Sequence, residues 1–201
     1  MPLTPRRPRL SVIARLLAPL VGVLLGALVL SGATPAQAAP IEEYASWQPG
    51  DRCRPTDKPG TAFLADWIVR KYGGGRGGIA RACTSSTSEH EEGRAFDWTL
   101  DATRKADRRR AAAFMTAVLA DGRGGQHHAR ARRMGLMYVI WNDRMFAAWD
   151  RFEPKTYLSS GCTKLTTCSK TLRHRDHLHL SLNRDGGWGR TSFFTQRMPK
   201  D

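Results

Sequence analysis

Hydrophobic and polar residues alternate in two short stretches of the chain. In "GRAFDWTL" the aromatic residues Phe96 and Trp98 fall on one side and Asp97 on the other, which predicts a half-buried strand. "HLHLSL" alternates in the same way, with three leucines on one face and the polar residues His177, His179 and Ser181 on the other. A third stretch, "GLMYVIW", is rich in residues that favour strands and predicts a central strand.

Other stretches repeat their apolar residues at helical spacing. "TAFLADWIVRKY" predicts a helix from residue 61, ended by "GGGRGG". Asp101 is the predicted N-cap of a helix that ends near Leu119, and a further helix is expected over 126–134. Residues 39–60, punctuated by proline and glycine, are expected to be irregular. The sequence therefore predicts one α+β domain, with an antiparallel sheet and flanking helices, rather than a regular βαβ array.

The N-terminal segment has the layout of a secretory signal peptide. A basic region that contains four arginines precedes an apolar run over 16–30, and Ala36-Gln37-Ala38 follows as a cleavage motif. The run is short for a membrane span and contains Pro19, which argues against an uncleaved anchor. We expect residues 1–38 to be removed and the protein to be secreted, with no membrane span remaining.

The chain is strongly basic. Its 201 residues carry a formal net charge of +14, and the four arginines of the signal peptide account for four of these charges. An exported basic protein could meet nucleic acid, an anionic membrane surface or an anionic cell wall, and charge alone does not choose among them. No basic-aromatic interleaving and no phosphate-cradling loop is evident, so we expect no nucleic-acid partner. We expect a monomer.

Four cysteines, an even number, fit an oxidising compartment. Three pairings are conceivable. We favour Cys53–Cys83 and Cys162–Cys168, because the second pair brackets the short polar loop "CTKLTTC". A zinc ribbon is disfavoured since no C-x-x-C occurs.

The two alternating stretches carry metal-ligand chemistry. If their strands are neighbours, Asp97 and His179 can converge, and His90 lies in the turn that feeds the first strand, where Gly93 lets the chain bend. A catalytic zinc takes three protein ligands of these types and leaves a position for water. The alternative is that these are ordinary polar residues on solvated strand faces.

These motifs resemble a known superfamily. "SEHEEGRAFD" fits the S-x-H-x-x-G-x-A-x-D pattern of the zinc D-alanyl-D-alanine peptidases, the VanY-like and hedgehog-fold superfamily. "HRDHLHLS" resembles its second motif, and the chain is most similar to secreted actinobacterial members. Lysostaphin-like peptidases place their His and Asp four residues apart, whereas His90 and Asp97 are seven apart. The resemblance covers residues 53–181 and implies a peptidase-like domain of this fold over 61–201.

The resemblance implies roles for the motif residues. Zinc would be held by His90, Asp97 and His179, and water activated by zinc would be the nucleophile. Asp176 would be the general base with His177 as its partner, although His177 could itself be the acid/base or stabilise the oxyanion. His174 is an outside candidate. In an ideal strand Asp176 would point away from His179, so the strand is expected to start or bulge after Asp176.

Further candidates surround these motifs. The resemblance implies that Arg81 steadies the substrate or the oxyanion. Ser88 could hydrogen-bond near the metal or the substrate, or simply form a turn. Trp141 and Asn142 could line the cleft, although for Trp141 core packing is the favoured interpretation.

The expected function is that of a secreted zinc peptidase that cuts peptidoglycan stem peptides or cross-links. The alternative is an inactive zinc-containing module that binds the cell wall, against which the acid at position 176 argues. The sequence does not identify the bond.

Overall fold

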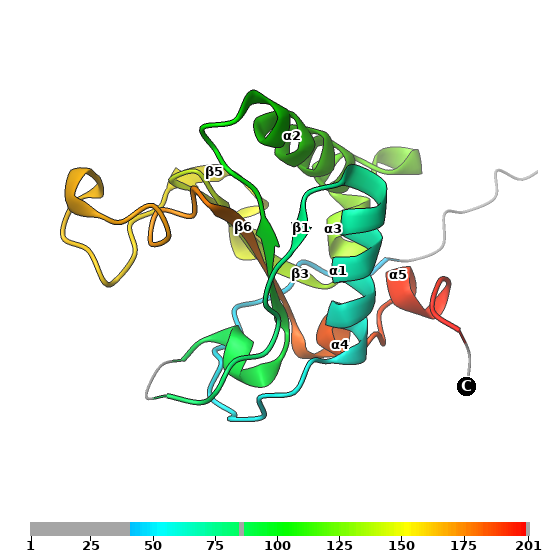
Figure 1. The fold of residues 1–201 in the computed structure, drawn as a ribbon. Coiled ribbons are helices and arrows are strands. Elements are labelled where there is room, and N and C mark those ends of the chain that lie inside the picture. Colours follow the sequence, from blue (N-terminus) through cyan, green and yellow to red (C-terminus); the bar gives the residue numbers. More distant parts are fainter. Residues whose placement is uncertain (1–40, 85–86, 200–201) are drawn as a thin grey trace, which may run out of the picture. The chain divides into compact units, whose positions relative to one another are not determined.

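The structure is a computed structural model that describes residues 41–84 and 87–199 (Figure 1). The predicted signal peptide lies outside these residues. No helix or strand forms over 41–58, within the segment expected to be irregular. The elements follow in chain order: α1 (Pro59–Tyr72), β1 (Gly75–Arg76), η1 (Glu89–Glu92), β2 (Ala95–Thr99), α2 (Lys105–Leu119), η2 (Arg123–Gly125), α3 (Ala129–Arg133), β3 (Leu136–Trp141), β4 (Arg144–Ala147), η3 (Ala148–Asp150), β5 (Pro154–Thr156), η4 (Leu165–Thr167), β6 (His177–Leu182), α4 (Arg184–Gly187) and α5 (Ser192–Thr195).

The strands form one sheet in the order β1-β2-β6-β3-β4-β5, and every neighbouring pair is antiparallel. β6 therefore lies between β2 and β3, although about eighty residues separate it from β2 along the chain. Helices flank the sheet, so the predicted α+β class is confirmed. The predicted central position of β3 is confirmed too, since β6 and β4 pair with its two edges.

The core lies between one face of the sheet and the helices. Phe96 and Trp98 from β2 and the three leucines of β6 are nearly inaccessible and share one cluster with apolar residues of α1 and α2. Burying each such side chain stabilises the fold by about 1.5–3 kcal/mol. In Figure 1 α1, α2 and α3 lie on the same side of the sheet, while the segment that connects β5 to β6 projects from the other side. The polar faces of β2 and β6 are thus left uncovered by these helices.

The helices begin and end differently from the prediction at several points. Asp101 is not the N-cap of α2, which begins at Lys105 after Arg104. The Asp101 carboxylate instead accepts hydrogen bonds from the Thr103 backbone N–H at 2.8 Å and from Lys170 at 2.8 Å. α3 is shorter than predicted because His128, at φ 50°, cannot continue a right-handed helix. No helix in the described ranges is long and apolar enough to cross a bilayer.

Two disulfides join Cys53 to Cys83 and Cys162 to Cys168, in the pairing that the sequence favoured. The first ties the irregular N-terminal segment to the loop that precedes η1. The second closes a small loop within the β5–β6 connection. Among the described residues no cysteine is free.

Gly93 ends η1 in the left-handed conformation, with φ 66°. A Cβ atom at this position would lie 1.9 Å from the carbonyl oxygen of Thr56, so a side chain there would push the N-terminal segment away. We expect Gly93→Ala to lower the free energy of unfolding by about 2–3 kcal/mol. Gly78→Ala is the control, since nothing lies within 4 Å of its Cβ position. Equal urea midpoints for the two variants would contradict this assignment.

Candidate metal centre

Three ligand-type side chains meet where β2 pairs with β6. The antiparallel register places Asp97 directly opposite His179, and η1 brings His90 beside them. Oδ1 of Asp97 lies 3.2 Å from Nε2 of His90 and 3.0 Å from Nδ1 of His179. The two histidine nitrogens are 3.3 Å apart. Both histidines are buried and Asp97 is half-buried, so the cluster forms a sheltered floor rather than a solvated surface.

These separations fit a metal ion. Zinc binds nitrogen and oxygen ligands at about 2.0–2.2 Å, which places tetrahedral ligand atoms about 3.3–3.6 Å from one another. The three atoms found here form a triangle of nearly that size. The His90–Asp97–His179 cluster could therefore hold a metal ion with little movement.

The nitrogens that face away from the triangle have partners of their own. Nδ1 of His90 lies 2.5 Å from the carbonyl oxygen of Ile79, so it carries the ring proton and donates a hydrogen bond to that oxygen. Nε2 of His179 lies 2.9 Å from the Ser181 hydroxyl, and Tyr138 stacks on the His179 ring. These contacts direct Nε2 of His90 and Nδ1 of His179 into the triangle as lone-pair donors, as metal-binding histidines require.

Charge within the cluster also suits a cation. Burial alone would raise the pKa of Asp97, but hydrogen bonds with His179 and His90 outweigh it and hold that pKa well below its usual range. Burial lowers the pKa of His179. For His90, burial lowers the pKa but the bond to Asp97 outweighs it, so the net shift is upward. At neutral pH Asp97 is ionised and His179 is neutral, which are the ligating forms.

We expect Ser181→Ala to weaken metal binding. The Ser181 side chain is fully buried, and its loss leaves Nε2 of His179 without the hydroxyl that orients the ring. Substitutions of such outer partners cost about 10–100-fold in metal affinity. Competition against a chromophoric zinc chelator measures the change. Ser169→Ala is the matched control on an exposed loop, and equal affinities in the two variants would contradict the orienting role.

The cluster lies at the floor of a cleft of about 430 Å³. Arg81 and Ser88 line this cleft, together with His174 and His177. The Arg81 side chain is about half exposed and its Nε lies 4.0 Å from Glu91. Ser88 is the N-cap of η1 and accepts a 3.4 Å hydrogen bond from the His90 backbone N–H, so it positions a ligand residue and also faces the cleft.

His177 and Asp176 form a pair beside the triangle. Nε2 of His177 lies 3.6 Å from Oδ1 of Asp97, and its Nδ1 lies 2.7 Å from Oδ1 of Asp176. Asp176 also accepts a 2.6 Å bond from the Thr171 hydroxyl. β6 begins at His177, immediately after Asp176. The direction of the Asp176 side chain is therefore not set by the alternation of the strand.

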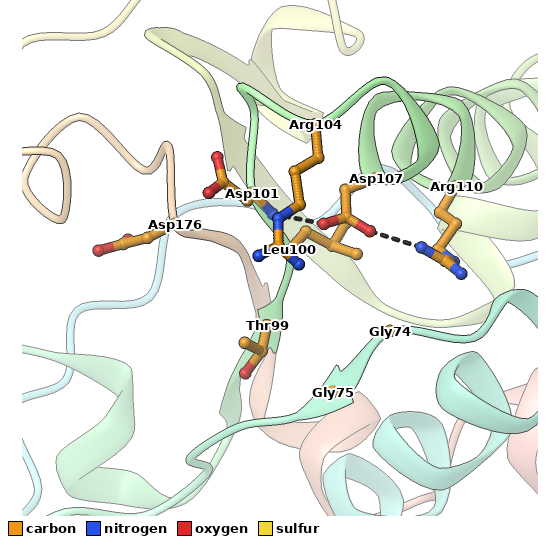
Figure 2. A pocket seen from close by; sticks show the side chains of 9 residues that line it. All are labelled: Gly74, Gly75, Thr99, Leu100, Asp101, Arg104, Asp107, Arg110 and Asp176. Carbon is orange, nitrogen blue, oxygen red and sulfur yellow. Dashed lines mark hydrogen bonds and ion pairs between the residues drawn. The ribbon is translucent and has the colours of Figure 1, made fainter.

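Asp176 does not line the metal cleft. It borders a different pocket, of about 460 Å³, at the end of β2. Figure 2 shows its carboxylate turned away from Asp101 and Arg104 across that pocket. Asp176 therefore stands behind His177, and the residue of the pair that faces the metal triangle is His177.

His174 belongs to the wall of the cleft. Its ring centroid lies 4.7 Å from that of His177 and 5.6 Å from that of His179. Burial, followed by the neighbouring histidines, lowers the pKa of His174 to about 3. His174 is thus neutral at physiological pH and adds no charge to the cleft.

Neither Trp141 nor Asn142 lines the cleft, and Trp141 packs against the core, the alternative that the sequence favoured for it. Ile140 pairs with His179 and faces the cleft, so Trp141 points to the opposite face of β3, where it packs against the core. Asn142 and Asp143 have positive φ values of 48° and 66° and form the two-residue turn between β3 and β4. Such residues favour this conformation, so Asn142 serves the hairpin.

The sequence interpretation missed several cleft residues. Glu89 accepts a 2.6 Å bond from the Tyr138 hydroxyl and lies 3.5 Å from Ser181, so it supports the outer partners of His179. Tyr157 and Thr171 come from the long β5–β6 connection and complete the wall. Their sequence surroundings offered no periodic signal, whereas the position of Ser181 two residues after His179 could have indicated its role.

Comparison with known proteins gives one match. The family model described as "VldE, C-terminal domain" matches residues 54–163, more than half of the chain. No curated protein and no solved structure matches. The matched range contains His90 and Asp97 and ends before Asp176, so it covers the η1–β2 part of the site and not the β6 part.

Proposed function

The chain belongs to the VldE C-terminal domain family, and we propose that it is a secreted zinc metallopeptidase that hydrolyses peptide bonds in peptidoglycan stem peptides or cross-links. One observation carries the proposal. A triangle of ligand atoms, with edges of 3.0–3.3 Å, lies at the floor of an open cleft, and a histidine paired with an aspartate stands beside it. A purely structural metal site would be closed by a fourth protein ligand, whereas this arrangement leaves room for water and substrate.

Each residue contributes a definite task in this proposal. His90, Asp97 and His179 would hold the zinc ion, which when bound would supply Lewis acidity and lower the pKa of water toward about 7. His177 takes a proton through its Nε2 and later returns it to the leaving amine. Asp176 accepts the Nδ1–H of His177, fixes its tautomer and stabilises its charged form. Arg81, on the cleft wall, offers a cation for a substrate carboxylate or for the developing oxyanion.

This assignment differs from the one that the sequence favoured. Asp176 was the expected base, but its carboxylate is held by His177 and Thr171 and does not line the cleft. His177 faces Asp97 and has a free Nε2 lone pair when its Nδ1 is protonated. We therefore give the proton transfer to His177 and the orienting role to Asp176.

Three further features fit a wall substrate. Both disulfides fit a protein exported into an oxidising compartment. Without the four arginines of residues 1–38 the formal net charge falls from +14 to +10, which still favours association with an anionic wall. A cleft of about 430 Å³ accommodates several residues of an extended peptide.

The test is mass spectrometry of purified peptidoglycan after incubation with the protein that lacks residues 1–38. Incubations with zinc, with chelator and with the His177→Ala variant are compared. We expect new stem-peptide products that require both zinc and His177, and the mass of the products names the bond. A folded, zinc-loaded protein that binds peptidoglycan but releases no product would contradict the proposal and favour the binding module.

A further inference from the structure

A second pocket, of about 200 Å³, lies between the N-terminal segment, η1 and the turn after β6. None of its lining residues lines the metal cleft. Five cationic side chains and one carboxylate, that of Glu92, form its walls: Arg52, Arg54, Lys58, Arg94 and Arg184. Trp188, which is 45% exposed, forms one side.

The acids nearby leave this pocket positive. Glu92 accepts a 2.6 Å bond from Nε of Arg94 and a 2.9 Å bond from the Arg52 backbone N–H. Burial raises the pKa of Glu92, but these bonds outweigh it and the net shift is downward, so Glu92 is ionised. Five cationic residues line this pocket among the described residues. Together with the adjacent Asp51 and Asp57, Glu92 brings the carboxylates to three, so the cations still outnumber them.

Lys58 is largely shielded from solvent. It is 8% exposed, and its ammonium group donates to the carbonyl oxygens of Arg54 and Thr56 at 3.3 and 3.1 Å. It also lies 5.2 Å from the centre of the Trp188 ring. An ammonium group has three protons, so one remains for a ligand. Both of its hydrogen bonds go to neutral carbonyl groups, so an anion that reaches the ammonium group adds a charge-assisted bond.

Arg184 also has a donor nitrogen without a partner among the described residues, in addition to the nitrogen that forms its ion pairs. Its Nη2 contacts Asp51 at 2.8 Å and Glu92 at 3.5 Å. Its Nε is buried and has no hydrogen-bond partner within the described ranges.

The backbone that carries these cations is fixed before any ligand arrives. Cys53 stands between Arg52 and Arg54 in the sequence, and its disulfide to Cys83 anchors the chain there. The backbone N–H of Arg54 donates to the backbone carbonyl oxygen of Glu91 at 2.8 Å, and that of Lys58 donates to the carbonyl oxygen of Gly93 at 3.0 Å. A ligand therefore pays little entropy for ordering the segment.

We propose that this pocket binds a phosphate group. A carboxylate offers two coplanar oxygens and suits one guanidinium fork, whereas phosphate presents three or more oxygens in different directions and a charge of about −1.5 to −2. Arg52, Arg54, Lys58 and Arg184 line the pocket from separate positions, which suits the second arrangement better than the first. The exposed Trp188 ring at the rim leaves space for a polyol or sugar attached to that phosphate. The phosphate can be a free ion or part of a wall phosphodiester polymer.

Isothermal titration calorimetry tests this on chelator-treated protein, so that phosphate cannot bind through zinc and the outcome does not depend on the peptidase proposal. The probes are inorganic phosphate, poly(glycerol phosphate) and acetate, at low ionic strength. The test variant is Arg52→Gln with Arg54→Gln, both exposed positions. The control variant is Arg109→Gln with Arg123→Gln, which loses the same charge at exposed positions elsewhere.

We expect saturable binding of one phosphate group per chain, weakened about tenfold or more in the test variant and less than about twofold in the control. Tighter binding of the polymer than of inorganic phosphate would identify the polymer as the source, and the reverse would identify the free ion. Equal weakening in both variants, no saturation up to about 10 mM phosphate, or acetate binding as tight as phosphate binding would each overturn the proposal. Unchanged circular dichroism and thermal midpoints verify that the variants fold.

Discussion

Asp97→Ala is expected to abolish zinc binding and to lower peptidase activity by more than about 100-fold. Substituting a residue that only orients a ligand costs at most about 100-fold. Oδ1 of Asp97 contacts Nε2 of His90 and Nδ1 of His179 and is the anionic corner of the triangle. Its removal leaves two neutral ligands, and the electrostatic attraction for a dication falls with the lost charge. Zinc content is measured by elemental mass spectrometry after gel filtration.

The matched control for this substitution is Asp66→Ala. Asp66 pairs with Arg76 on the surface, where such pairs contribute little to stability. We expect this variant to keep one zinc ion per chain and full activity. Zinc content in Asp97→Ala equal to that in Asp66→Ala would show that the metal, if any, lies elsewhere.

His177→Ala is expected to lower kcat by about 10²–10⁴-fold while zinc remains bound. His177 is not one of the three triangle residues, so its loss removes proton transfer and leaves the ligands in place. Asp176→Asn is expected to lower kcat by less, because His177 stays in the cleft without its orienting carboxylate. Steady-state kinetics on a soluble stem peptide, with zinc content determined for each sample, separate these effects.

His127→Ala serves as the control, since its side chain is 68% exposed and pairs with Asp121. We expect no change in kcat there. A larger loss in Asp176→Asn than in His177→Ala would reverse the two roles and restore the aspartate as the base. Loss of zinc in His177→Ala would make His177 a ligand.

The sequence predicted the convergence of Asp97 and His179 because strand alternation has a period of two. Once β2 and β6 are paired, every second residue of each strand lies on the same face of the sheet. Asp97 and His179 therefore share one face, while their apolar neighbours along each strand point to the other face. Alternation gave no such guide for Trp141, for which core packing was the favoured alternative and is the one found. Every residue of "LMYVIW" is apolar or aromatic, so no alternation in that stretch reveals which face each side chain takes.

Local hydrogen bonding explains the other differences. Asp101 has the composition of an N-cap, but its carboxylate is used by a turn and by Lys170, which is distant in sequence. The direction of Asp176 depends on where β6 begins and on Thr171, neither of which has a periodic signal. Asn142 and Asp143 stand between two strand-forming stretches, and this pair of residues is itself a turn signal that predicts the hairpin.

The most direct measurement is anomalous diffraction at the zinc edge from crystals of the zinc-loaded protein. The central claim is that two distant sequence motifs form one metal centre. It predicts a single strong peak about 2.0–2.2 Å from Nε2 of His90, Oδ1 of Asp97 and Nδ1 of His179, with His177 outside bonding distance. A peak on other residues, a fourth protein ligand that closes the site, or no peak at full zinc loading would contradict it.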